Sequence, residues 1–87
     1  MVDMKLLDFL NRMLYNIEAM ERRIKELKQK VEDLKELSSV RSVKSSEIAN
    51  GWLDLVGAND HFRFFLGEYE RFFEIASEYV EEVYRRS

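Results

Sequence analysis

The chain of 87 residues contains no cysteine, no proline and no threonine, and only one histidine and three glycines. Without cysteine the protein has no disulfide, no thiolate nucleophile and no cysteine-based metal site. His61 has neither a second histidine nor a glutamate at the spacing of a metal site, which excludes a di-iron helical bundle. The scattered glycines form no phosphate-binding loop. We therefore expect a protein that is not an enzyme and uses no metal or cofactor.

Long apolar runs and a strong basic charge are missing as well. No stretch of about 18 apolar residues is present, and the first residues lack the basic and unbroken apolar segments of an export signal. The net charge of −3 provides no overall positive field that would attract nucleic acid. We expect a cytoplasmic protein without membrane contact, in which any nucleic-acid binding is local.

The composition predicts a folded chain with a modest core. Hydrophobic residues make up 46% and charged residues 36%, which is too apolar for a disordered protein. A chain of this length forms one domain, here residues 1–87, and buries little surface by itself. Association with a second subunit would therefore stabilise it substantially.

The chain does contain a long heptad repeat. From Leu6 to Leu34 the apolar residues alternate in steps of four and three without a break, which is typical of a helix that packs along one seam. The pattern predicts a helix over about residues 3–37, roughly 50 Å long. The first heptad row contains Leu10, Ile17, Ile24 and Val31, and the second contains Leu6, Met13, Met20, Leu27 and Leu34.

The two halves of this predicted helix differ in what borders the heptad rows. In the first half, additional apolar residues widen the apolar face, so that half needs covering from more than one side. In the second half, basic residues border the rows and would repel each other in a parallel pair of identical helices, so this half favours an acidic partner. The basic residues are Arg23, Lys28, Lys30 and Lys35. The predicted oligomer interface comprises Leu6, Leu7, Phe9, Leu10, Met13, Leu14 and Ile17.

The C-terminal third is rich in aromatic residues at helical spacing. Residues 61–73, HFRFFLGEYERFF, contain five of the six phenylalanines, and the pattern predicts a helix over about residues 60–85 with Asn59 or Asp60 as its N-cap. Base-stacking surfaces pair their rings with lysine and arginine, whereas glutamates border this stripe, so we interpret the rings as core. The apolar stripe contains Phe62, Phe65, Tyr69, Phe72, Ala76, Tyr79 and Val83, with Glu70, Glu74 and Glu81 on one margin and Glu68 on the other.

One aromatic residue does not belong to this stripe. Phe64 lies almost opposite it at 100° per residue. Together with Ile75 and the marginal Tyr79, it predicts a second contact face.

The segment between the two predicted helices is rich in serine. Helical spacing of apolar residues predicts a short middle helix over about residues 46–56, capped by Ser45 or Ser46 and ended by Gly57. Residues 38–45 are expected to form a loop or an extension of the first helix. A basic patch around residues 22–44 is compatible with either a local anion contact or a merely solvated connection. Its residues are Arg22, Lys25, Arg41 and Lys44.

These patterns together predict an all-α fold. We expect a small bundle of two long helices and a short middle helix, completed by self-association into a homodimer. The predicted function is a non-enzymatic helical interaction or structural module that acts through homo-oligomerisation and a protein partner. The alternative is a nucleic-acid-associated regulator that uses the basic patch. The pattern leaves parallel and antiparallel placement of the long helices open.

Overall fold

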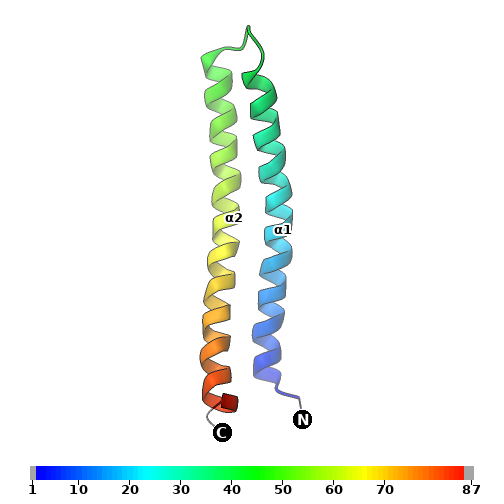
Figure 1. The fold of residues 1–87 in the computed structure, drawn as a ribbon, viewed down its shortest axis with the longest axis vertical. Coiled ribbons are helices and arrows are strands. Elements are labelled where there is room, and N and C mark those ends of the chain that lie inside the picture. The colour runs from blue at the N-terminus through cyan, green and yellow to red at the C-terminus, as the bar shows by residue number, and fades with distance from the viewer. Residues whose placement is uncertain (1, 86–87) are drawn as a thin grey trace. The chain divides into compact units, whose positions relative to one another are not determined.

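The computed structural model describes residues 2–85, which form two long α-helices and a short π-helix (Figure 1). Helix α1 comprises Met4–Ser38, helix α2 comprises Ser45–Val80, and the π-helix η1 comprises Glu81–Arg85. Residues 2–85 contain no β-strand. The all-α prediction is therefore confirmed, and α1 matches the helix that the heptad repeat predicts.

Helix α1 begins at a capping aspartate and ends at a serine-rich turn. The side chain of Asp3 accepts a hydrogen bond from the backbone N–H of Leu6 at 3.0 Å, so it satisfies an amide that has no partner inside the helix. At the other end, the Ser38 hydroxyl donates to the Leu34 carbonyl at 2.7 Å. The turn at residues 39–44 then leads into α2, where the N–H of Glu47 donates to the Lys44 carbonyl at 3.0 Å.

The predicted short middle helix is wrong, because α2 runs without interruption through Gly57 and the Asn59–Asp60 pair. No glycine of the described chain has a positive φ, so Gly57 does not end the helix in the left-handed conformation. A glycine inside a helix costs about 1 kcal/mol relative to alanine. A break would instead leave unpaired backbone groups at two new helix ends, so continuation is favoured. Asn59 and Asp60 are interior residues and do not cap a helix.

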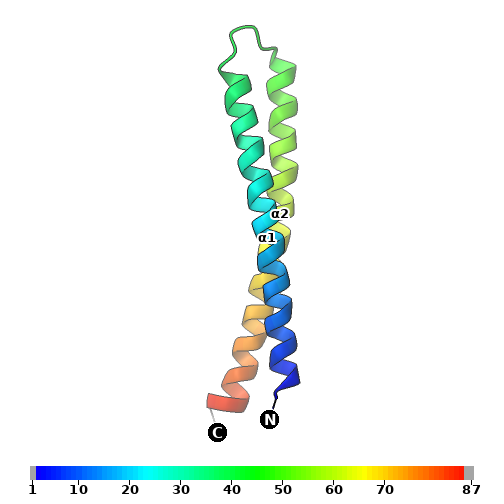
Figure 2. The same ribbon diagram turned by 90° about the vertical axis from the view of Figure 1, so that its right-hand side faces the viewer.

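The chain consists of two compact units, each containing part of both helices. Of the described chain, unit 1 comprises residues 2–20 and 64–85, and unit 2 comprises residues 21–63. The segments of α1 and α2 are antiparallel in each unit (Figure 2). In unit 1, Asp3 contacts Tyr79. In unit 2, the helices are joined by the turn, and Leu34 lies against Gly51.

Small side chains occupy the positions where the helices are most closely packed. The buried apolar residues of the described chain are alanines, namely Ala19, Ala58 and Ala76, and the buried polar residue is Asn16. No large side chain in the described part is fully buried. Several large apolar side chains remain between 43% and 57% exposed, among them Leu10, Val31, Trp52 and Phe73. The helices therefore leave apolar surface uncovered.

Candidate interaction surface

The two heptad rows of α1 differ in how well they are covered. Every residue of the second row, from Leu6 to Leu34, is half-buried. In the first row, Leu10 is 43% exposed and Ile24 and Val31 are each 50% exposed, and Ile17 is half-buried. The α2 segments thus cover one row and leave most of the other open, although a heptad helix normally buries both rows.

Unit 1 has an apolar groove beside the contact between its helices. The residues that line this unit 1 groove come from both helices, and the groove has a volume of about 270 Å³. Phe73 stands at its edge with 53% of its surface exposed. The lining consists of Leu6, Leu10 and Met13 from α1, and of Phe73, Ala76, Ser77, Val80, Glu81 and Arg85 from the C-terminal helices.

The groove contains part of the interface that the sequence predicts. Leu6, Leu10 and Met13 line it, while Leu7 and Leu14 are exposed on α1. Phe9 lies elsewhere. Its ring packs edge-on against Tyr79, with the ring centroids 5.9 Å apart, so Phe9 belongs to the contact between α1 and α2.

Unit 2 has a comparable open apolar face. Its helices meet where the Leu34 side chain lies against Gly51. At 100° per residue, Val31 is rotated about 60° around the axis of α1 from Leu34, and Trp52 is rotated about 100° around the axis of α2 from Gly51. Because the helices are antiparallel, these rotations place Val31 and Trp52 on the same side of the helix pair, where Trp52 is 57% exposed. We call this surface the unit 2 face, and it comprises Ile24, Val31, Trp52 and Val56.

A cluster of polar groups joins the start of α1 to the end of the chain. The Tyr79 hydroxyl donates to both carboxylate oxygens of Asp3 at 3.0 and 2.9 Å, and the Tyr84 hydroxyl donates to Oδ2. On an α-helix, residues five apart point about 140° away from each other. The π-helix η1 has wider turns, which bring Tyr84 to the same side as Tyr79.

These hydrogen bonds shift the titration of all three groups. The Tyr84 hydroxyl, followed by the Leu6 amide, lowers the pKa of Asp3, because both stabilise the carboxylate form. The hydrogen bonds to Asp3 raise the pKa of Tyr79 and of Tyr84, since they stabilise the protonated phenols. The aspartate before the heptad repeat could have suggested a cap, but no sequence pattern pointed to Tyr84.

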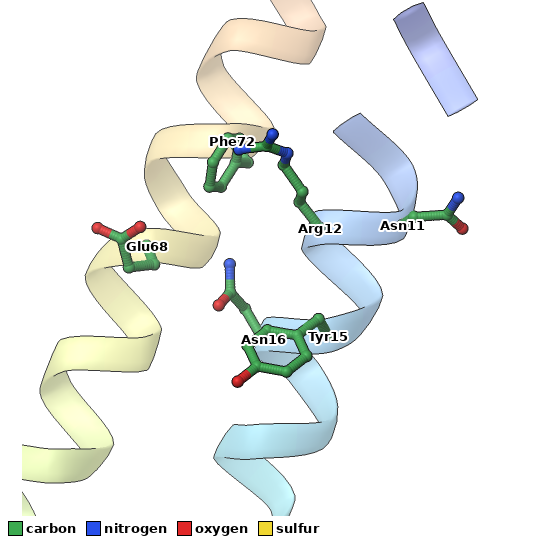
Figure 3. A pocket seen from close by; sticks show the side chains of 6 residues that line it. All are labelled: Asn11, Arg12, Tyr15, Asn16, Glu68 and Phe72. Atoms are coloured by element: carbon green, nitrogen blue, oxygen red, sulfur yellow. The ribbon is translucent and has the colours of Figure 1, made fainter. Parts of the chain in front are cut away.

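A second pocket in unit 1 is lined mainly by side chains that carry a polar group (Figure 3). It has a volume of about 350 Å³. The Arg12 guanidinium lies 5.2 Å from the centroid of the Phe72 ring and also pairs with Asp8 at 3.1 Å. Asn16, which is buried, points toward α2 here, and the heptad pattern gave no signal for it. The lining residues are Asn11, Arg12, Tyr15, Asn16, Glu68 and Phe72.

The residues of the predicted second contact face differ in how far they are exposed. Phe64 is exposed, and its ring packs edge-on against Phe65 with a centroid distance of 5.2 Å. Ile75 is half-buried, and Tyr79 is hydrogen-bonded to Asp3. Of these residues only Phe64 offers a large apolar side chain to solvent.

The predicted basic residues are all exposed in unit 2, but they do not form a cluster. Lys25 precedes the turn by about 13 residues of α1, a distance of about 20 Å along the helix. Arg41 lies in the turn, and Lys44 lies immediately before α2. Arg22 lies one helical turn before Lys25. A local phosphate contact would therefore involve one pair of these cations at a time.

Comparison with known protein families, curated protein sequences and solved structures gives no match for this chain. Within residues 2–85, neither long helix has an apolar stretch that could span a bilayer. His61 is exposed on α2 in unit 2. The open apolar surfaces are therefore the features from which a function can be argued.

Proposed function

We propose that the protein is a non-enzymatic helical interaction module that self-associates in the cytoplasm through the unit 1 groove and the unit 2 face. A homodimer is the preferred form. The observation that carries this proposal is the open first heptad row, in which Leu10, Ile24 and Val31 keep about half of their surface exposed. Each fully buried side chain of this kind contributes about 1.5–3 kcal/mol, so covering the row favours association.

The exposed aromatic side chains also support association. Trp52 on the unit 2 face is 57% exposed, and Phe73 at the unit 1 groove is 53% exposed. Aromatic residues of this kind are enriched in protein interfaces, so both are suited to be covered by a partner.

A substitution in the groove tests the proposal. Leu10→Asp places a charge where a second copy would bury it, and we expect the dissociation constant to rise at least about 100-fold. Because Leu10 is already 43% exposed, the helices of a single chain should still form. The association is measured by sedimentation velocity over a concentration series, with helix content checked by circular dichroism.

Leu53→Asp provides the matched control. Leu53 is exposed, but its position on α2 is turned away from the unit 2 face. We expect this variant to associate as the wild type does. Equal weakening by both substitutions would argue against the proposed surface, because it would indicate a general effect of the added charge.

The nucleic-acid alternative has weaker support, because its four basic residues are spread along unit 2. Unit 2 as a whole carries nine basic and eight acidic residues, a net charge of +1. Binding to duplex DNA or RNA at low salt, lost when Arg41 and Lys44 are both changed to glutamate, would favour this alternative.

A further inference from the structure

The unit 1 groove has one apolar border and one acidic border. On α1 the border is apolar, with Leu10 and Leu14 exposed. On α2 the exposed Phe73 has Glu70 three residues before it and Ser77 four residues after it, so these are its surface neighbours. Glu81 lines the groove one further turn along, followed by Arg85. With two glutamates and one arginine, the charge on this border is negative.

The unit 2 face also has one apolar border and one charged border, but the charge is of the opposite sign. On α2 its border is apolar, with Trp52 and Val56 exposed. On α1 the exposed Val31 has Lys28 three residues before it and Lys35 four residues after it, and both lysines are exposed. Ile24 on the same face has the exposed Glu21 three residues before it, so two lysines and one glutamate give this border a positive charge.

We infer that the unit 1 groove of one copy docks onto the unit 2 face of a second copy, with the Glu70 and Glu81 border beside the Lys28 and Lys35 border. This inference rests on the proposed self-association and adds which surfaces meet. Groove against groove would bring the glutamate borders of two copies together, and face against face would do the same with the lysines. Like charges at an interface oppose association, whereas opposite charges favour it and set the register.

The net charges of the two units favour docking of unit 1 on unit 2. The described part of unit 1 carries nine acidic and four basic residues, a net charge of −5, against +1 for unit 2. The ion pairs at the groove and at the neighbouring α1 surface join residues of one helix, such as Arg85 with Glu81 at 3.7 Å. These pairs are largely exposed and weak, so they leave the border charges available to a second copy.

Charge reversal on each border provides the test. In one variant Lys28 and Lys35 are both changed to glutamate, and in the other Glu70 and Glu81 are both changed to lysine. Each variant alone should self-associate at least about tenfold more weakly than the wild type in 50 mM salt, because both of its surfaces then carry the same charge. An equimolar mixture of the two should associate with wild-type affinity, as should a chain that carries all four changes.

The controls carry the same charge changes away from the docking surfaces. Arg22→Glu with Lys25→Glu reverses two cations on the outer side of α1 in unit 2. Glu78→Lys with Glu82→Lys reverses two exposed carboxylates that lie five and nine residues after Phe73 and are turned to the opposite side of the helix from it. Both control variants should associate within about threefold of the wild type.

The outcomes separate this inference from the proposed function. If the wild type associates, Leu10→Asp abolishes association and neither border variant weakens it, the docking of unit 1 on unit 2 is wrong while self-association stands. If the wild type stays monomeric at all concentrations, both proposals fail. Loss of association in each border variant with recovery in the mixture supports the docking and is not expected for groove against groove.

Discussion

Replacing Gly57 with alanine tests whether α2 is continuous, because the two interpretations of this residue predict opposite signs. In the structure Gly57 lies inside α2 with a negative φ, and a β-carbon added to it would meet no other atom within 4 Å. Alanine in a helix interior is about 0.8–1 kcal/mol more favourable than glycine, so Gly57→Ala should stabilise the protein by about that amount. If Gly57 ended a short helix in the left-handed conformation, alanine would destabilise it by about 1 kcal/mol.

The assay is thermal unfolding followed by circular dichroism at one fixed protein concentration, because self-association makes the midpoint concentration-dependent. For a chain of this length, 1 kcal/mol corresponds to a rise of about 4–8 °C. Gly67→Ala should give a similar rise, since an added β-carbon is equally free of contacts. At Gly51 an added β-carbon would lie 3.0 Å from Cδ1 of Leu34, so Gly51→Ala should stabilise less than the other two. A lower midpoint for Gly57→Ala would refute the continuous helix.

Two further predictions concern the ends of the helices and the turn. Because the pKa of Asp3 is lowered in the folded protein, its carboxylate stabilises the fold at pH values above the unfolded pKa near 3.8. This stabilisation is lost as the pH falls through the folded pKa. Because the pKa values of Tyr79 and Tyr84 are raised, their protonated hydroxyls stabilise the fold below about pH 10, and this stabilisation is lost as the pH rises further. Urea titrations should therefore show losses at both extremes that are smaller in Asp3→Asn, and equal losses in both proteins would contradict the cluster. Hydrogen exchange should be fast in the turn at residues 40–44 and slow at residues 57–60, and fast exchange at 57–60 would indicate a break in α2.

The residue pattern alone was sufficient to predict α1, because nine apolar residues at heptad spacing from Leu6 to Leu34 are a strong helix signal. The residue pattern did not predict that α2 is continuous. Gly57, Asn59 and Asp60 are individually typical of helix ends, but their combined local cost is smaller than that of breaking a long hydrogen-bonded helix. The preference of single residues for helix ends decides where a helix ends only if packing and backbone hydrogen bonding do not oppose it.

The face of α1 that meets α2 could not be predicted from the heptad repeat. The buried residues there are Asn16 and Ala19, which belong to neither heptad row, because small side chains allow the helices to approach closely. As a result, Leu10 and Val31 lie at the side of the contact and remain half exposed. The sequence did predict that the first half of α1 needs a second cover, because Leu7 and Leu14 widen its apolar face.

The contact between Asp3 and Tyr84 depends on features that the sequence does not show. Its formation requires the π-helical turn at residues 81–85, and regular α-helical spacing would direct Tyr84 away from Tyr79. The contact also joins residues that are 81 positions apart. Periodicity describes one helix at a time and cannot identify such a pair.

The mass of the wild-type protein in solution shows whether a second copy covers the open apolar surfaces. Light scattering coupled to gel filtration should give about 21 kDa at micromolar concentration, twice the chain mass of 10.5 kDa. A mass of 10.5 kDa that stays constant up to the highest soluble concentration would show that no second copy binds.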